Sequence, residues 1–582
     1  MLFDTIPVVP NPASDRLISR KAASRIAAAD STLYDYSSEV VEFSGRFMGW
    51  TRLASEPPFD PAEIMEFARG LRADGLESVL LIGQGGSTQA SMTMASLLAA
   101  AGRLDIAFHT MDSLAPSQVR AVLDSIDPAK TIFIVSSKSG STIEPTMVFK
   151  CVWDDTCRRI GAEAAGKRFV AITDPGSQLE AMAGELGFLR TFPGLKNVGG
   201  RFSALSVFGL VPFALMGVDV EELLRRCAKI QEACSQDSID NPALRLASFI
   251  KECQMRDRDK LIFHFSDSCL VLGMWLEQLV AESLGKLGRG VLPSTERDMD
   301  LVCRSIPDAG VIIYTMACDE ASGSEETQSR TRIERVCDDV PSLSLVIEDP
   351  LDVAAHFVLW EYAVAMIASL IGINAFDQPD VESTKKTVRL FLGIGREDSP
   401  QPSLDPGDYL TPDGSEGVVG FEVSRALSRG VTPPADLDDA LGLLFASMRR
   451  GDYFSLNAFL PADEGEEHEI LESIRHRVSR QTGCASCLEI GPRYLHSIGQ
   501  FQKGAQNKGI LLVVSADAEN DLAIPGEWFT LGQLAATQAR GDFSALEEAN
   551  RRVVHVHLAD SAPKTLRLLA DRIARHIPLQ LS

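Results

Sequence analysis

Two short apolar runs, each followed by a glycine- and serine-rich loop and then by a helical pattern, constrain the fold of this chain more than any other feature. The run 78–82 (SVLLI) precedes the loop GQGGST, and the run 131–135 (TIFIV) precedes SSKSGST. Continuous apolar runs of this length are typical of strands buried on both faces, as in a parallel sheet covered by helices. The rhythm therefore predicts an α/β fold of doubly wound parallel sheets.

The same rhythm recurs after about residue 225, so we expect two units of similar architecture. Its strand candidates are 261–265 (LIFHF) and 310–316 (GVIIYTM), with long apolar helices at MWLEQLVAESLGK and VAAHFVLWEYAVAMIASLIG. Beyond a Pro/Asp/Gly-rich stretch at 397–417, typical of a linker, further strand-like runs alternate with helical patterns. The predicted organisation is a helical lead-in over 1–75, a first unit over 76–225, a second over 226–396 and a C-terminal α+β unit over 418–582.

Charge and cysteine usage exclude several classes of function. The net charge of −24 disfavours nucleic acid and anionic membrane surfaces as partners. Eleven scattered cysteines indicate reduced thiols, and the lone CxxC at Cys484 and Cys487 lacks a second pair for zinc. The N-terminus does not resemble a signal peptide, and the uncharged stretch 202–218 is too short to span a membrane. We expect a cytoplasmic protein in which 202–218 forms a buried helix.

The two glycine- and serine-rich loops carry groups that suit a phosphate. Backbone N–H groups, hydroxyls and a following helix N-terminus are what a phosphate monoester requires. Either loop alone could equally be a simple connection, and neither contains a Walker or dinucleotide fingerprint. Two such loops in one unit favour a phosphate ester ligand. The residues offered are Gly85, Gly86, Ser87 and Thr88 in the first loop and Ser137, Lys138, Ser139, Ser141 and Thr142 in the second.

Gln278, Glu282 and Lys286 lie four residues apart in an apolar helix and so share one face. A solvated Glu–Lys pair is one interpretation of this spacing. The apolar context of Glu282 favours another, in which a desolvated carboxylate gains basicity and removes a proton next to a carbonyl.

Six stretches together resemble the glucose-6-phosphate isomerase family. They are GQGGST, SSKSGSTIEP, GGRFSALS, EQLVAESLGK, INAFDQPDVESTKK and LHSIGQ, spread from about residue 80 to about residue 500. Within that family, the order of AESxGK, FDQP and LHSxGQ is most similar to the isomerase half of transaldolase–isomerase fusion proteins, here without the transaldolase half.

The resemblance implies a fold of two sugar-isomerase (SIS) type units and interconversion of glucose 6-phosphate and fructose 6-phosphate through ring opening and an enediolate, without metal or redox cofactor. It implies that Glu282 moves the proton between C1 and C2, Arg201 stabilises the enediolate, and His496 and Lys385 assist at the ring oxygen. The residues implied in holding the sugar phosphate are Gly86, Ser87, Ser137, Lys138, Ser139, Thr142, Gln278 and Gln378. A homodimer is also implied.

Ring opening needs an acid–base pair, for which His and Lys are suited, and enediolate formation needs a fixed cation in a dry pocket. The sequence departs from the family at Leu284, where a polar residue is usual, and at Asp380, where glycine is common. His496 follows Lys385 instead of preceding it and could be a structural histidine, whereas His356 lies in an apolar helix and is expected in the core. A sugar-phosphate-binding protein without turnover, or an isomerase of another 6-substituted sugar, remains an alternative.

Overall fold

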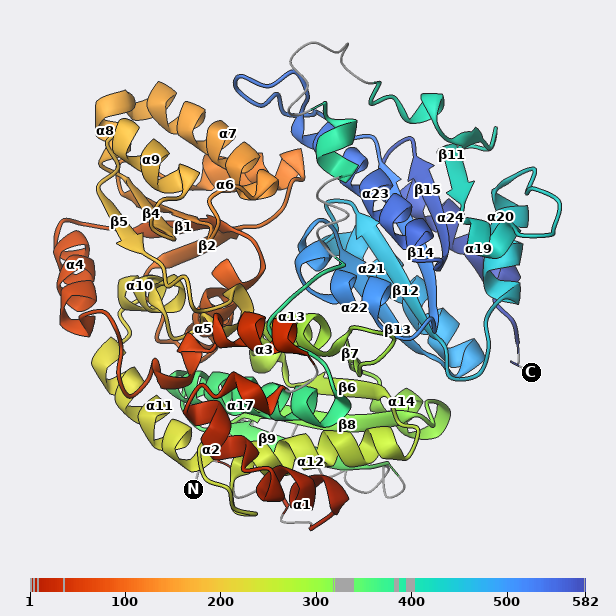
Figure 1. Cartoon of the computed structure of the whole chain (residues 1–582). Helices are drawn as coiled ribbons and strands as arrows, with labels where there is room; N and C mark the ends of the chain where they lie inside the picture. The colour runs from red at the N-terminus through yellow and green to blue at the C-terminus, as the bar shows by residue number, and fades with distance from the viewer. Residues whose placement is uncertain are drawn as a thin grey trace.

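The computed structural model describes residues 3, 6–7, 10–34, 37–317, 319, 340–380, 387–393, 403–579 and 581. Within this part of the chain, three sheets follow one another along the sequence (Figure 1). The segment before the first sheet is helical, as predicted, and its first helices pack against the helices of the second sheet. Its helices are α1 (Pro12–Ser19), α2 (Ala22–Ala27), α3 (Ser38–Gly45) and α4 (Pro61–Ala73).

The first sheet is parallel, with strand order β2-β1-β3-β4-β5. Every residue of β1 and β3 is buried, as their apolar runs predict. Because β1 and β3 are neighbours and the chain leaves them in opposite directions along the sheet, their carboxyl ends form a topological switch point, where ligands of such folds bind. The strands are β1 (Ser78–Gly83), β2 (Ala107–Met111), β3 (Thr131–Ser136), β4 (Phe169–Thr173) and β5 (Arg190–Pro193).

Helices cover both faces of this sheet, which completes the predicted doubly wound unit (Figure 1). The stretch 202–218 contains the buried helix α10, as expected. The helices are α5 (Gln89–Ala100), α6 (Pro116–Ser125), α7 (Ile143–Ile160), α8 (Ala162–Gly166), α9 (Gln178–Glu185), α10 (Val207–Leu215) and α11 (Val220–Cys234).

The second sheet repeats this architecture with four parallel strands in the order β7-β6-β8-β9. Its strands are β6 (Lys260–Phe265), β7 (Leu292–Thr295), β8 (Ala309–Met316) and β9 (Ser342–Ile347), and its helices are α12 (Pro242–Met255), α13 (Leu272–Leu284), α14 (Met299–Ser305) and α17 (Val353–Ile371). In the described part of the chain, 350–371 is the stretch long and apolar enough to cross a membrane, but its apolar window is entirely buried inside the protein. It is the central core helix between α11, α12 and α13.

The third sheet is mixed, with strand order β10-β11-β15-β14-β12-β13. Its strands β12 to β15 run parallel, and β10 and β11 are antiparallel. The short strand β10 lies within the stretch predicted as a linker. The strands are β10 (Thr411–Pro412), β11 (Val418–Val423), β12 (Tyr453–Phe459), β13 (Ala485–Ile490), β14 (Gly509–Ala516) and β15 (Arg552–Leu558).

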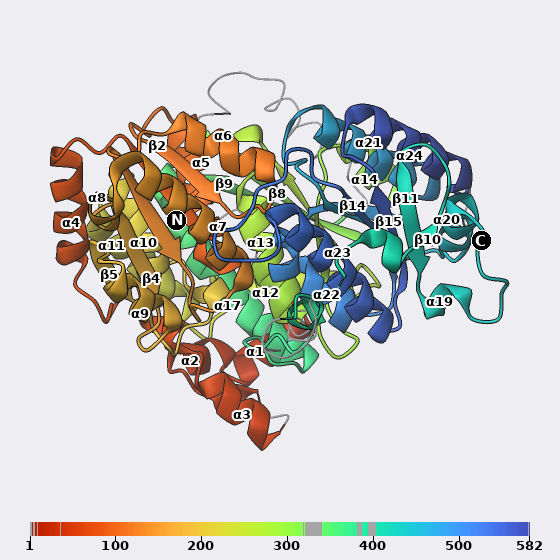
Figure 2. The ribbon, with the colours of Figure 1, turned by 90° about the horizontal axis from the view of Figure 1, so that it is seen from above.

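The third unit packs against the first two units through its helices. Figures 1 and 2 show the third sheet to one side of the first two, with α22 facing α13. The helices are α19 (Arg425–Ser428), α20 (Leu437–Ala446), α21 (Gly465–Thr482), α22 (Ile498–Gly504), α23 (Leu531–Glu548) and α24 (Pro563–His576). Single 3₁₀ turns are η1 (Ser31–Leu33), η2 (Gly49–Arg52), η3 (Gly85–Ser87), η4 (Gly200–Phe202), η5 (Asp267–Cys269), η6 (Pro350–Asp352), η7 (Pro406–Asp408) and η8 (Arg493–His496).

A buried ion pair fastens α22 to α23. Lys503 Nζ lies 2.5 Å from Asp542 Oδ1, and the two side chains are 2% and 0% exposed. The hydroxyl of Tyr494 donates to the other carboxylate oxygen of Asp542 at 2.6 Å. Since α22 begins within the LHSIGQ motif, at Ile498, this pair fixes the chain that carries His496.

Asp542→Ala should lower the free energy of unfolding by about 3–5 kcal/mol, because it leaves the Lys503 ammonium buried without its counter-charge. Chemical denaturation followed by circular dichroism measures this loss. Glu548→Ala, an exposed substitution on the same helix, should change stability by no more than about 0.5 kcal/mol. Equal losses in the two variants would contradict the importance of the pair.

Candidate active site

One face of α13 carries two buried polar side chains. Gln278 Nε2 donates to Glu282 Oε2 at 3.3 Å, and each of the two residues is 5% exposed. Burial raises the pKa of Glu282 above its ordinary value, although the charges of Arg201, His496 and Lys286 and the Gln278 hydrogen bond oppose the rise. Glu282 is therefore not a solvated surface residue; it is a desolvated carboxylate with increased basicity.

Arg201 lies against Glu282 with every guanidinium nitrogen engaged. Its Nε donates to Ser283 Oγ at 2.8 Å, and its Nη1 donates to Glu282 Oε2 at 3.3 Å and to Gln378 Oε1 at 2.7 Å. Its Nη2 donates to the carbonyl oxygens of residues 375 and 377 at 2.5 and 2.9 Å. The guanidinium is 4% exposed, so its charge acts in a nearly dry environment.

Lys286 lies just beyond the end of α13, which ends at Leu284, and anchors the chain after α17. Its Nζ donates to the Asn374 carbonyl at 2.7 Å and to Asp377 Oδ1 at 2.7 Å. Burial, together with the charge of Arg201, lowers the pKa of Lys286 to about 7. The prediction that Lys286 shares a helix face with Gln278 and Glu282 is wrong, because the helix ends before it; its contacts are with residues 374 and 377.

The first predicted phosphate loop packs directly on this cluster. A β-carbon built on Gly86 would stand 2.2 Å from the Gly200 carbonyl oxygen and 2.8 Å from Arg201 N. Gly85, whose φ is +55°, is equally confined: a β-carbon there would stand 2.8 Å from Gln278 Nε2 and 3.2 Å from His496 Cβ. These glycines bring the loop, Arg201, Gln278 and His496 together. Ser87 follows in the same 3₁₀ turn.

The second predicted loop follows β3, beside the first. Ser137 is buried, and its Oγ has no hydrogen-bond partner among the described residues, as expected of a group that awaits a ligand. The Gln278 Oε1 atom is unsatisfied in the same way. Lys138, in contrast, is held by Asp174 Oδ2 at 2.5 Å, so its charge is already compensated. Ser139 and Thr142 lie further along the loop, Thr142 at the start of α7.

His496 reaches the cluster from the third unit and contacts a carboxylate that the sequence analysis did not assign. Its Nε2 lies 3.2 Å from Glu144 Oε1, which also accepts a hydrogen bond from Gln538 Nε2 at 2.6 Å. Burial would raise the pKa of Glu144, but the His496 charge and hydrogen bonds more than offset this and leave it lowered. Glu144 belongs to the quoted SSKSGSTIEP motif, where Glu144-Pro145 indicated only a helix start.

The remaining predicted residues fall in different places. Gln378 lies against Arg201. Lys385 lies outside the described residues. Leu284 is fully buried in the apolar core, and the Asp380 carboxylate accepts from Gln500 Nε2 at 2.5 Å, so neither departure from the family pattern faces the Glu282–Arg201 cluster. His356 is a core residue, as expected: it is fully buried, and burial lowers its pKa to about 3.

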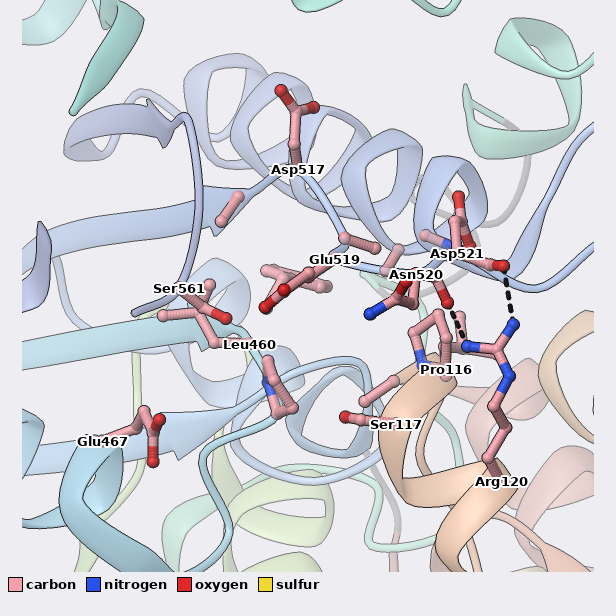
Figure 3. A pocket seen from close by; sticks show the side chains of 18 of the residues that line it. Pro116, Ser117, Arg120, Leu460, Glu467, Asp517, Glu519, Asn520, Asp521 and Ser561 are labelled. Carbon is pink, nitrogen blue, oxygen red and sulfur yellow. Dashed lines mark hydrogen bonds between the residues drawn. The ribbon is translucent and has the colours of Figure 1, made fainter. Parts of the chain in front are cut away.

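A cavity of about 890 Å³ lies elsewhere, between the start of α6 and the loops after β12 and β14 (Figure 3). Arg120 crosses to the second of these loops and donates to the carbonyl oxygens of Asn520 and Asp521. None of the predicted site residues lines this cavity. Its side chains include exposed carboxylates, and its arginine is engaged, so it does not provide a phosphate site. The Glu282–Arg201 cluster, in contrast, places a buried guanidinium next to a buried carboxylate.

Part of the chain is similar to known proteins. Residues 66–293 match the family model "Phosphoglucose isomerase". The chain is 27% identical over 421 residues to the glucose-6-phosphate isomerase of Mycoplasmopsis pulmonis, covering 63% of this chain and 97% of that protein. It is 31% identical over 360 residues to that of a Synechococcus strain, covering 55% of this chain and 66% of that protein.

The fold has counterparts among solved structures. A glucose-6-phosphate isomerase from Chlamydia trachomatis superposes with a TM-score of 0.53 at 18% identity, over 66% of this chain and 86% of that chain. A hypothetical protein from Thermus thermophilus superposes with a TM-score of 0.55 at 24% identity, over 65% of this chain and 97% of that chain.

Two doubly wound parallel sheets, with a buried carboxylate and guanidinium in contact at their junction, form the fold that this chain shares with these solved structures. Residues 66–293, the part of the chain that matches the phosphoglucose isomerase family model, carry both loops, Arg201 and Glu282.

Gly86→Ala should lower the free energy of unfolding by about 1–3 kcal/mol, because the new methyl group meets backbone atoms that no rotation of a side chain can move. Chemical denaturation of the purified variant measures the change. In Gly184→Ala, on α9, the new methyl group meets nothing within 4 Å, so stability should stay the same or rise. A Gly86→Ala variant as stable as the wild type would contradict the close packing of the loop on residues 200 and 201.

Proposed function

We propose that this chain interconverts glucose 6-phosphate and fructose 6-phosphate. The observation that carries the proposal is the buried Glu282–Arg201 contact of 3.3 Å beside two hydroxyl-rich loops, within residues matched by the phosphoglucose isomerase family. A desolvated carboxylate next to a fixed guanidinium is suited to removing a proton α to a carbonyl and stabilising the resulting enediolate.

The proposed mechanism begins with binding and ring opening. The phosphate is held by backbone N–H groups and hydroxyls of the two loops, with the unsatisfied Ser137 Oγ as one donor. His496, oriented by Glu144, transfers a proton at the ring oxygen, and Gln538 keeps the Glu144 carboxylate in place. Lys385 keeps its predicted role near the ring oxygen.

Isomerisation of the open chain then needs one base and one cation. Glu282 takes the proton from C2 and returns it to C1, which is possible because the two carbons are adjacent on one face of the enediolate. Arg201 stabilises the negative charge on the enediolate oxygens, and the dry surroundings strengthen that interaction. Gln278 orients Glu282 and lines the sugar pocket.

A protein that binds sugar phosphate without turnover was suggested by the substitutions at Leu284 and Asp380. Both side chains point away from the cluster, so they do not support this alternative. An isomerase of another 6-substituted sugar shares the mechanism and is distinguished by substrate. The late position of His496 supports kinship with the isomerase half of transaldolase–isomerase fusion proteins. A homodimer and a cytoplasmic location stay predictions.

Purified protein incubated with fructose 6-phosphate should form glucose 6-phosphate, detected as NADPH by coupled glucose-6-phosphate dehydrogenase. Glu282→Gln should retain sugar-phosphate binding and lose both turnover and exchange of the C2 proton with solvent. Binding without NADPH formation by the wild type would overturn the proposal in favour of a sugar-phosphate-binding protein. Exchange that persists in Glu282→Gln would identify another group as the base.

The acid limb of kcat/KM should lie above pH 4.5, the ordinary value for glutamate, because burial raises the pKa of Glu282 and the base must be ionised to act. Arg201→Gln removes a charge that favours the carboxylate, so the residual activity should show an acid limb at still higher pH. Arg567→Gln, on the surface of α24, should leave the profile unchanged. An unmoved limb in Arg201→Gln would contradict this electrostatic coupling.

A further inference from the structure

A second cavity, of about 760 Å³, opens where the three units meet. Its walls come from the chain after β2, from α13 and β7, and from α21 and β13 of the third unit. Figure 1 shows α13, β7, β13 and α21 close together at this junction. The cavity includes neither Glu282 nor either predicted phosphate loop.

Two arginines in the wall, Arg475 and Arg493, are each paired with two carboxylates, and a third, Arg297, pairs with Asp267. Arg493 donates through Nε and Nη2 to Asp112 at 2.7 and 3.0 Å, and its Nη1 lies 2.7 Å from Asp463 Oδ1. Arg475 pairs in the same way with Glu296 and Glu472, both at 2.7 Å. Arg475 and Arg493 leave little capacity for an anionic ligand, and each of the two is outnumbered by its acidic partners.

Two further carboxylates in the wall form no close ion pair with a described residue. Glu489, on β13, is only 5% exposed and forms no hydrogen bond or ion pair with any described residue. Glu277, on α13, accepts hydrogen bonds from Ser497 Oγ at 2.6 Å and from the backbone N–H of Ile498. Burial raises the pKa of Glu277 to about 7, and burial together with the charge of Glu277 raises that of Glu489 further above its ordinary range. The charge of Arg493, and for Glu489 also that of Arg475, opposes these rises without cancelling them.

We propose that this cavity binds a small organic cation with primary ammonium groups, which Glu277 and Glu489 receive at its inner end. A primary ammonium supplies three N–H donors and the positive charge that the unpartnered carboxylate lacks. The rim residues Glu464 and Glu469 could receive a second ammonium, which favours a linear diamine. Among the described residues, no group of three or more His, Cys, Asp or Glu side chains could hold a metal ion, so an inorganic cation fits poorly.

The walls of the cavity join directly to the candidate active site. Glu277 precedes Gln278 on α13, and Ser497 follows His496. The carbonyl oxygen of Asp112 accepts from Gln84 Nε2 at 2.6 Å, next to the first glycine loop. An ammonium that draws Glu277 toward itself therefore acts on segments that carry catalytic groups. This consequence rests on the proposed function, whereas the binding site does not.

Calorimetric titration of the full chain with 1,4-diaminobutane at about 0.15 M ionic strength tests the site, because this salt concentration screens nonspecific attraction to an acidic surface. We expect saturable binding of the diamine and none of 1,4-butanediol, which has the same length without charge. Glu489→Gln should weaken binding at least tenfold. Glu163→Gln removes the same charge from an exposed position on α8, and it should change the affinity for the diamine less than twofold.

No binding of the diamine by the wild type, or equal binding by wild type and Glu489→Gln, would overturn the proposal. If Glu489→Gln does not fold, the wild type still provides a test: the diamine should raise its thermal denaturation midpoint and the diol should not. Equal shifts with the two compounds would overturn the proposal. Because neither readout depends on turnover, a failed isomerase assay leaves this test intact.

Discussion

The buried guanidinium of Arg201 holds together segments that lie far apart in the sequence. Its donors engage α13 through Ser283 and Glu282 and the chain after α17 through Gln378 and two carbonyl oxygens. A charge this deeply buried is tolerated only when all of its donors are satisfied. The same geometry that stabilises the junction of the first two sheets therefore sets the distance between a carboxylate base and a cation. An arginine can do this because its five donors form a rigid fork, which lysine lacks.

Helix α13 separates two regions of opposite electrostatic character. Gln278 and Glu282 face Arg201, where cationic groups gather, whereas the adjacent Glu277 faces a cavity with an excess of carboxylates. Consecutive residues on a helix point about 100° apart, so one helix can line both regions. The charges on the two sides differ: near Glu282 the groups Arg201, Lys286 and His496 each lie beside a carboxylate, whereas more carboxylates than arginines line the cavity beside Glu277.

The sequence predicted the strands and the glycine-rich loops because each of these elements depends mainly on the residues that form it. The apolar runs of β1 and β3 predict buried strands, and the glycines after β1 predict a tight loop. The Glu144–His496 contact and the Glu277–Glu489 pair could not be predicted this way, since each joins residues that only the docking of the third unit brings together. Glu144 lies in the stretch SSKSGSTIEP, where the proline that follows it indicates the start of a helix. Nothing in the neighbouring residues indicates that its carboxylate contacts His496. Lys138 was predicted as a phosphate ligand, and only the fold reveals its contact with Asp174.

The third unit completes the candidate active site because it supplies His496. Its docking depends on polar contacts that cross the junction: His496 with Glu144, Ser497 with Glu277, and Arg493 with Asp112. Polar contacts of this kind are directional, so a small displacement of η8 would separate the histidine from its carboxylate while leaving the Glu282–Arg201 cluster intact. In the proposed mechanism, proton transfer at the ring oxygen and proton transfer at C2 therefore depend on different interfaces, and the acidic cavity lies at the interface on which the first depends.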